Sequence, residues 1–270
     1  MLEPPERWPR PQFGALWAHR DLAYFLSWRD VKIRYKQSFV GIGWAVVQPL
    51  GSMLALTFVF DGIANVPSEG IPYPVFVLAG LIPWAYFSTS ISASSSSLVG
   101  NLTLVTKVYF PRIVLPVSSV LTPLVDLVIA TLLLLGLMAI YGIFPRPSAL
   151  LLPLLVLFIM LAALGVGLLL ASINAKYRDV VQTLSFVLQI WLFLTPVVYP
   201  GSLVPESGPL RFIYGLNPMV GAIELFRWAV VGTPPPPLSF VVSSVCVVLI
   251  LLVLGSVYFA KTEQHFADVI

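Results

Sequence analysis

Charged residues and cysteines are both scarce in this chain of 270 residues. Charged residues make up 10% of the sequence, hydrophobic residues make up 58%, and the mean hydropathy is +0.94. Soluble domains carry about 25% charged residues, so the composition excludes a soluble globular domain and indicates an integral membrane protein. The single cysteine, Cys246, lies in an apolar run, which excludes a disulfide framework and a cysteine-based metal site.

Several motifs of catalytic sites are also missing from the sequence. There is no GxxxxGK[ST] phosphate loop, whose glycine backbone and lysine would hold nucleotide phosphates, so the chain cannot hydrolyse ATP by itself. There is no DxD or paired-carboxylate cluster to hold a divalent metal against a sugar nucleotide, which disfavours an embedded glycosyltransferase. There is also no basic patch with interleaved stacking aromatics. We therefore expect no catalytic residue, metal or cofactor in this chain, and no nucleic-acid partner.

Six segments are apolar enough to cross a bilayer, which takes roughly 20 residues. They are residues 38–61, 73–97, 113–142, 149–173, 181–200 and 238–260. Serines and glutamines dilute the second and the fifth, while the third is long enough to tilt or to extend past the bilayer. The pattern predicts an all-α integral membrane protein with six transmembrane helices, forming one transmembrane domain over residues 38–260.

The fifteen lysines and arginines are divided unevenly between the connections. If the amino terminus lies in the cytoplasm, twelve of them fall inside and only Arg146, Arg211 and Arg227 fall outside. Basic residues concentrate on the cytoplasmic side of membrane proteins, so we expect both termini, including the tail 261–270, to be cytoplasmic. A secretory signal is not expected, because residues 1–37 are charged and broken by four prolines.

The connection 201–237 is too polar to cross the bilayer, yet it contains the signals of a helix. Asn217 can cap it, Pro218 suits its first turn, and Gly232 lies just past its end. An ordinary external loop and a pair of short re-entrant helices both agree with this pattern. We favour the re-entrant helices before the last span, because such segments are tolerated at membrane depth where protein or a water-filled cavity surrounds them.

The amino-terminal segment 1–37 has the pattern of an interfacial helix. Five aromatic or apolar residues fall within one arc of a helix, namely Trp17, Tyr24, Trp28, Val31 and Tyr35. Arg29, Lys32 and Lys36 form a basic stripe beside this arc, and Leu22, Leu26 and Ile33 occupy a third face. The segment is therefore expected to pack on protein as well as on lipid headgroups. Asp30 and Arg34 are four residues apart, and their pairing would contribute little if exposed.

Six motifs recur in a familiar order along nearly the whole chain. They are RDVKIRYKQSFVGIGWAVVQP (29–49), KVYFPRIVLP (107–116), KYRDV (176–180), TPVVYP (195–200), LNPM (216–219) and EQHFADVI (263–270). In combination they resemble the permease subunit of ABC exporters for lipid-linked polysaccharides. The O-antigen exporters are the nearest match, and teichoic-acid and capsule exporters share the pattern.

This resemblance implies an architecture and a set of partners. It implies a homodimer of six-span subunits in the inner membrane of a bacterium, bound to two copies of a separate ATPase that holds ATP and Mg. It also implies an amino-terminal helix on the inner surface, a coupling helix between the second and third spans, and re-entrant helices before the last span. The cargo would be a polysaccharide linked to polyprenyl pyrophosphate.

The connection 98–112 has the character of a docking segment, because it is too apolar for a solvated loop and Asn101 can cap a short helix in it. A loop that folds back on its own spans is the alternative. The candidate coupling residues are Asn101, Lys107, Val108, Tyr109, Phe110 and Arg112. The cytoplasmic turn KYRDV is a possible second contact with the partner.

Aromatic residues are candidates for holding a sugar polymer as it slides, since tyrosine and tryptophan offer flat amphipathic faces. The candidates are Trp84, Tyr86, Phe87, Trp191, Phe193 and Tyr199. Core packing and an interfacial belt are the alternatives for these residues. The serines in 92–97 could add hydroxyl groups without charge.

The basic stripe of Arg29, Lys32 and Lys36 lies where a lipid pyrophosphate would arrive, although binding of anionic headgroups would also explain it. Our interpretation is a permease subunit, not an enzyme, that exports a lipid-linked polysaccharide with a partner ATPase. An exporter of another cargo, such as teichoic acid, capsule, lipid or drug, is one alternative. A proton-coupled flippase is another, but Asp126 is its only clear intramembrane carboxylate, for which a structural role is also open.

Overall fold

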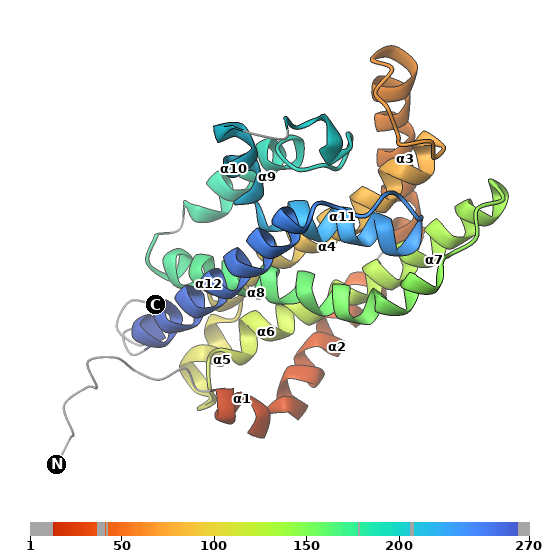
Figure 1. Cartoon of the computed structure of the whole chain (residues 1–270). Helices are drawn as coiled ribbons and strands as arrows, with labels where there is room; N and C mark the ends of the chain where they lie inside the picture. The colour runs from red at the N-terminus through yellow and green to blue at the C-terminus, as the bar shows by residue number, and fades with distance from the viewer. Residues whose placement is uncertain (1–12, 37–40, 42, 178, 206–207, 264–270) are drawn as a thin grey trace.

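The computed structural model describes residues 13–36, 41, 43–177, 179–205 and 208–263. These residues form helices joined by turns and loops, with no strand among them, as the sequence predicts. Figure 1 shows the helices packed side by side as an oblique bundle. The helices are α1 (Phe13–Ala18), α2 (Arg20–Lys36), α3 (Gly43–Thr57), η1 (Phe58–Ile63), α4 (Tyr73–Gly100), α5 (Leu102–Lys107), α6 (Val114–Leu121), α7 (Leu124–Ile140), η2 (Pro147–Leu151), α8 (Leu152–Lys176), α9 (Val180–Phe193), η3 (Gly201–Leu203), α10 (Pro209–Gly215), α11 (Pro218–Val230) and α12 (Leu238–Glu263).

Five helical stretches of the described chain are long and apolar enough to cross a membrane. They are Gly43–Ile63, Tyr73–Gly100, Val114–Ile140, Pro147–Lys176 and Leu238–Glu263, and they coincide with five of the six predicted spans. The remaining predicted span, 181–200, is helical only in α9, which has 14 residues. The chain leaves the helix at Phe193 and continues through turns, so a full helical crossing is not formed there.

Helix α4 is the centre of the bundle. In its apolar window 78% of residues are buried, whereas in the α3 stretch only 6% are, so α3 stands at the edge of this protomer. Helix α4 packs along α8, which packs along α12. Glycines permit the second contact, because a Cβ on Gly255 would lie 2.3 Å from the carbonyl oxygen of Gly165. Replacement by any larger residue would force α8 and α12 apart.

The serine run in the second predicted span does not interrupt α4. The hydroxyls of Ser92, Ser95, Ser96 and Ser97 all donate to carbonyl oxygens three or four residues earlier in the same helix. These bonds satisfy four of the five hydroxyl groups of the run within the helix, so the run can enter an apolar bundle, while the buried Ser94 hydroxyl has no hydrogen-bond partner among the described residues. The predicted span 73–97 is therefore a continuous helix, Tyr73–Gly100.

The third predicted span consists of α6 and α7, separated at Thr122 and Pro123. Proline lacks a backbone N–H, so it interrupts the helical hydrogen-bond ladder there. The 27 residues of the stretch would extend about 40 Å, which exceeds the roughly 30 Å of a hydrocarbon core. Helix α2 packs along α6, and the Ser27 hydroxyl donates to the Ser118 carbonyl at 3.1 Å.

The packing face of α2 differs in part from the predicted one. Ala23, Leu26, Ser27 and Val31 are buried, whereas Ile33 is exposed. The expectation that the helix packs on protein is thus confirmed through Leu26 but wrong for Ile33. Val31 of the predicted aromatic arc is buried as well, whereas Trp17, Tyr24 and Trp28 remain exposed at the edge of the packed face, where an interfacial helix would meet lipid.

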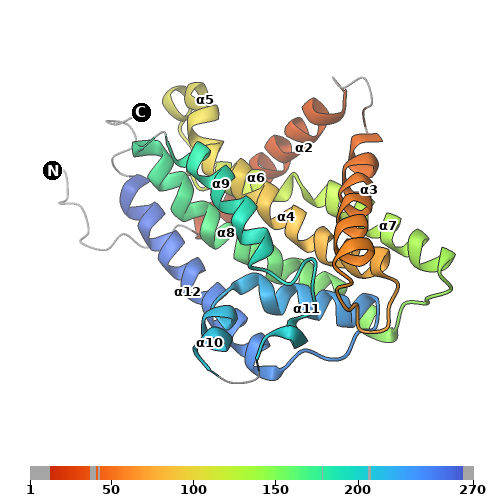
Figure 2. The ribbon, with the colours of Figure 1, turned by 90° about the horizontal axis from the view of Figure 1, so that it is seen from above.

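The signals read between the fifth and sixth predicted spans do form a helix. The Asn217 side chain accepts a hydrogen bond from the Met219 N–H at 3.0 Å, Pro218 begins α11, and Gly232 follows its end with φ +87. Figure 2 shows α10 and α11 at one end of the bundle and α5 at the other. Helix α11 packs against α4, α8 and α12, so this segment is part of the bundle and not a solvated loop.

Candidate functional site

The basic stripe on α2 is formed as the sequence predicts. Arg29, Lys32 and Lys36 line one open hollow of about 300 Å³ together with Phe25 and Trp28. The Lys32 ammonium lies 5.6 Å from the centre of the Trp28 ring, within cation–π range. Cationic and aromatic groups therefore converge on one face of α2. Whether this hollow meets a pyrophosphate stays a prediction.

Arg29 has a second role that the sequence did not indicate. Its guanidinium pairs with Asp30 at 2.8 Å, and its Nη2 donates to the Asn101 side-chain oxygen at 3.1 Å. Arg29 therefore connects α2 to the residue that precedes α5. The pairing of Asp30 with Arg34 considered from the sequence does not form, because each finds another partner: Asp30 pairs with Arg29 and Arg34 with Asp126.

The connection 98–112 contains a helix, but a shorter one than its apolar residues suggested. Helix α5 ends at Lys107, so Val108, Tyr109 and Phe110 follow the helix instead of lying on it. Asn101 occupies the N-cap position, yet its side chain forms no cap. Its amide donates to the Ser97 carbonyl at 2.9 Å, and its oxygen accepts from Arg29. The competing partner on α2 explains why the expected cap is absent.

The predicted coupling residues divide into exposed and packed groups. Lys107, Val108 and Tyr109 are exposed, and Tyr109 is fully so. Phe110 is partly buried against the apolar cluster beneath α2 and α6. The Arg112 guanidinium donates to the Glu263 carbonyl and the Arg112 N–H donates to the Glu263 carboxylate, both at 2.8 Å. The connection is thus tied to the end of α12, while Val108 and Tyr109 remain available.

The candidate channel aromatics also divide into two groups. Trp84, Tyr86 and Phe87 are buried on α4, with Phe87 5.3 Å and Trp84 6.2 Å from the Trp191 ring on α9. These rings hold α9 against α4 through edge-to-face contacts. Phe193 is exposed and Tyr199 is partly exposed. Their contact with a sugar polymer stays a prediction.

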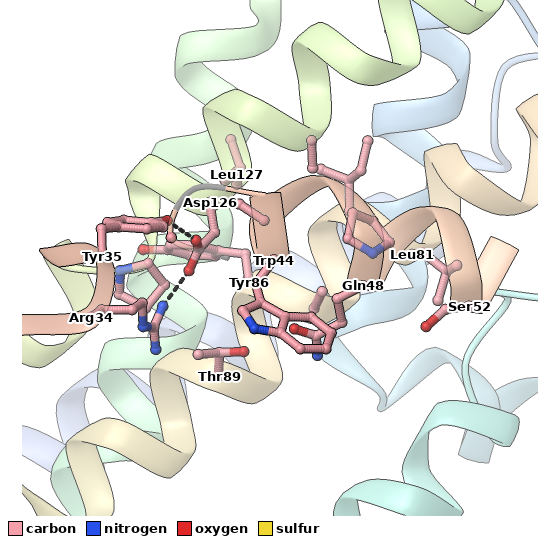
Figure 3. Close-up of a pocket in the computed structure, with 17 residues that line it drawn as sticks. Arg34, Tyr35, Trp44, Gln48, Ser52, Leu81, Tyr86, Thr89, Asp126 and Leu127 are labelled. Carbon is pink, nitrogen blue, oxygen red and sulfur yellow. Dashed lines mark hydrogen bonds and ion pairs between the residues drawn. The ribbon is translucent and has the colours of Figure 1, made fainter. Parts of the chain in front are cut away.

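Asp126 is the centre of a cluster with Arg34 and Tyr35 that was not predicted from the sequence. Its carboxylate accepts from the Arg34 guanidinium and from the Tyr35 hydroxyl (Figure 3). Asp126 lies in the first turn of α7, where the helix dipole favours a negative charge. Burial, together with the bond to Asp126, raises the pKa of Tyr35, so its hydroxyl stays a donor at neutral pH. A carboxylate within a predicted span indicates that it has a cationic partner. The sequence could not identify Arg34 as that partner, because Arg34 lies 92 residues earlier in the chain.

Arg227 is a second charged residue whose surroundings were not predicted from the sequence. We counted it among the external basic residues, yet its side chain is wholly buried in α11. Its Nε donates to the Phe76 carbonyl at 3.1 Å, and its Nη2 donates to the Val197 carbonyl at 2.5 Å. Its Nη1 lies 3.8 Å from Glu224. The guanidinium therefore joins α11, α4 and the turn after α9.

The surroundings of Arg227 are adapted to it. Gly80 on α4 provides the space that the Arg227 guanidinium occupies, because a Cβ at this position would lie 2.4 Å from the guanidinium. The guanidinium also lies over the Phe76 ring, 3.7 Å from its centre. Glu224 in turn accepts from the Gly201 N–H at 3.0 Å. The pair of charges thus replaces the missing helical bonds of the turns between α9 and η3.

The sequence of these elements matches one family. A family model of ABC-2 type transporters matches residues 22–231. The chain belongs to the ABC-2 type transporter family. The matched region of this ABC-2 type transporter includes the basic stripe, the Asp126 cluster, the connection 98–112 and Arg227.

Individual relatives cover most of this ABC-2 type transporter. It is 33% identical to the O-antigen export system permease protein RfbA of Myxococcus xanthus, over 94% of this chain and 96% of the relative. It is 26% identical to the protein of the same name from Klebsiella pneumoniae, over 93% and 95%. It is also 26% identical to the polysialic acid transport protein KpsM of Escherichia coli, over 75% and 78%.

Proposed function

We propose that this chain is the membrane-spanning permease subunit of an ATP-driven exporter that carries a polyprenyl-pyrophosphate-linked, O-antigen-like polysaccharide across the bacterial inner membrane. The observation that carries this proposal is the similarity to an O-antigen export permease over 94% of the chain. A separate ATPase, in two copies, would bind ATP and Mg, and two permease subunits would form the pathway. Helix α3 and helix α9 are largely exposed in the protomer, which supports further packing against a second copy.

Another polysaccharide is the alternative cargo, and the similarity to a polysialic acid transport protein favours it. A proton-coupled flippase is supported less well. Asp126 has a cationic partner and a hydroxyl donor, so its protonation would disrupt two interactions. Such a residue is suited to a fixed structural role more than to carrying protons.

The proposed topology has six crossings with both termini in the cytoplasm. Helix α9 and the turns after it would form the fifth crossing, and α10 and α11 would be re-entrant from the outer side. If α7 lies in the hydrocarbon region, then α6 extends below it and α2 lies along the inner surface. Asp126, in the first turn of α7, would then lie at the inner boundary of the bilayer.

The function is tested by reconstituting the permease with its ATPase in vesicles. Export of lipid-linked polysaccharide is expected only when the ATPase and ATP are both present, and the permease alone is expected to hydrolyse no ATP. Lipid-linked polymer that becomes accessible to a hydrolase on the far side measures export. Transport driven by a proton gradient without ATP would contradict the proposal and favour the flippase.

The basic stripe would receive the pyrophosphate of the cargo. Its ammonium and guanidinium groups suit charge-assisted hydrogen bonds to phosphate oxygens. Near a membrane surface each basic residue also contributes about 1 kcal/mol toward binding anionic lipid. We place the pyrophosphate in the hollow of Arg29, Lys32 and Lys36.

Reversing the three charges together, as Arg29→Glu, Lys32→Glu and Lys36→Glu, is expected to abolish export while membrane insertion and ATPase association persist. Because Arg29 also contacts Asn101, the double variant Lys32→Glu, Lys36→Glu isolates the pyrophosphate role and is expected to reduce export at least about tenfold. Polymer at the cell surface measures the effect.

A matched control for the double variant reverses two other inside charges, as Arg20→Glu and Lys261→Glu, and is expected to keep most export if orientation is preserved. A reporter fused to the carboxyl terminus checks that orientation in every variant. Normal export by a correctly oriented triple variant of the stripe would leave it only a headgroup role.

A further inference from the structure

A pocket of about 400 Å³ lies between α2, α3, α4 and α7. Figure 3 shows it bordered by the cluster of Arg34, Tyr35 and Asp126 and by Trp44 and Gln48 of α3. Its volume falls within the roughly 300–1,000 Å³ range of small-molecule sites. The pocket is separate from the hollow of the basic stripe, because the two share no lining residue.

The pocket carries no net charge among its described lining residues. Arg34 and Asp126 are its charged residues, and they pair with one another. Tyr35 contributes a hydroxyl that already donates to the same carboxylate. A pocket without net charge is a poor receptor for a phosphate or an ammonium ion, whereas a few polar groups in an otherwise apolar wall suit an uncharged ligand that has both hydroxyl groups and an apolar face.

Neutral polar side chains lie among mainly aliphatic residues in the rest of the lining, such as Leu81, Ile82 and Leu127. Gln48, Ser52 and Thr89 form no side-chain hydrogen bond with any residue that the structure describes, and Figure 3 shows them around the pocket. An amide offers both donors and an acceptor, and a hydroxyl can donate and accept. Together they can match the mixed donors and acceptors of a sugar.

Two aromatic rings add flat surfaces to the aliphatic wall of the pocket. Trp44 is 54% exposed in the protomer, so its indole face is available to a ligand. The Tyr86 hydroxyl donates to the Val120 carbonyl at 3.0 Å, so this residue contributes only its ring. An indole face beside hydrogen-bonding groups matches a pyranose, which has one apolar face and a rim of hydroxyls.

We propose that this pocket binds one uncharged sugar residue of the cargo, with its ring against Trp44 and its hydroxyls toward Gln48, Ser52 and the Arg34–Asp126 pair. This inference rests on the proposed function. Arg34 and Tyr35 lie in the same last turn of α2 as Lys36 of the basic stripe, so the pocket and the hollow lie on different faces of one helical turn. The sugar held there is the one attached to the pyrophosphate.

The test compares two lipid probes on the full permease–ATPase complex in nanodiscs. One probe is a polyprenyl pyrophosphate bearing a single N-acetylglucosamine, and the other is the same lipid without sugar. Wild type is expected to bind the sugar-bearing probe about tenfold more tightly, as ring stacking and a few hydrogen bonds would supply. Trp44→Ala is expected to bring the ratio of the two affinities close to one while leaving the affinity for bare lipid unchanged. Trp44→Phe is expected to restore part of the ratio.

Trp17→Ala is the matched control, because Trp17 is an exposed tryptophan of α1 outside this pocket, and its affinity ratio is expected to equal that of wild type. A Trp44→Ala protein that keeps the tenfold ratio would overturn the inference. Equal affinities of wild type for the two probes would also overturn the inference, as expected if the pocket holds a phospholipid headgroup. The proposed function would still stand in that case if cells export polymer. Failure of wild type to bind either probe would overturn both.

Discussion

Replacing Arg227 by alanine is expected to destabilise the permease by about 3–5 kcal/mol, the usual cost of removing one partner of a buried ion pair. The variant would leave the Val197 carbonyl without its side-chain donor and would remove the second donor of the Phe76 carbonyl, which lies within α4. It would also leave the buried Glu224 carboxylate without its cation. Each buried polar group that loses its partner costs about 1–3 kcal/mol, so these losses agree with the total.

The structural consequence would be local to the end of the bundle that α10 and α11 form. The turns after α9 have no helical ladder, and Arg227 and Glu224 attach them to α4 and α11. Without the guanidinium, the carboxyl-terminal end of α9 would separate from α4. We therefore expect α9 to gain proteolytic sensitivity before the long helices do.

The free energy of unfolding of the purified permease, measured by titration with a denaturing detergent, tests this expectation. Arg227→Lys keeps the charge but loses the forked geometry, so an intermediate loss is expected. Arg146→Ala is the matched control, because Arg146 is exposed and its loss should cost little. A loss below about 1 kcal/mol for Arg227→Ala would show that the pair does not support the fold.

The double substitution Val108→Ser, Tyr109→Ser is expected to abolish co-purification of the permease with its ATPase. Both side chains are exposed directly after α5, and Tyr109 has no covering group in the described protomer. Burial of such side chains at an interface contributes about 1.5–3 kcal/mol each. Even the lower value, for both together, corresponds to a loss of affinity of about 100-fold.

This choice of residues follows from the structure. Phe110 packs against the permease itself, and Arg112 holds Glu263 at the end of α12, so substitution of either would disturb the protomer. Val108 and Tyr109 can be changed without breaking an internal contact of that kind. Because the connection continues into α4 and is tied to α12, movement of a docked ATPase would reach both helices.

Pull-down of the ATPase with tagged permease, together with polymer export in cells, measures the outcome. Ile140→Ser, Phe144→Ser is the matched control, since both side chains are exposed at the opposite end of the bundle and should keep normal association. Normal association and export by the Val108, Tyr109 variant would mean that the ATPase binds elsewhere. Helix α2 and the KYRDV turn would then be the remaining candidates.

Much of the fold could be predicted because its signals are local. Runs of apolar residues predicted α4, α8 and α12 to within a few residues, since hydropathy and length decide which helices suit a bilayer. The capping asparagine, the first-turn proline and the glycine after the end of α11 also predicted that helix correctly. Hydropathy did not predict where the helix in 181–200 ends, because it counts apolar residues without regard to their backbone, and Pro196 favours an extended residue before it.

The candidate site could be predicted only in part, because some of its contacts join residues that are distant in the sequence. The basic stripe follows from helical spacing within one segment, and the structure does gather it around one hollow. The partners of Arg29, Arg34 and Arg227 could not be found in the same way. Each contacts a residue or carbonyl at least 30 positions away along the chain, as Arg227 does at Val197.

By itself, the sequence determined that this protein is a helical membrane protein without a phosphate loop, with a basic stripe beside its first span and an apolar connection after its second. Those properties depend on composition and on short-range spacing. Only the tertiary structure decided that Arg34 neutralises Asp126 beside Trp44, that Arg227 is buried, and that Tyr109 is left exposed while Phe110 is packed. The free energy of a charge or an aromatic ring depends on what surrounds it, and those surroundings come from helices that are distant in sequence.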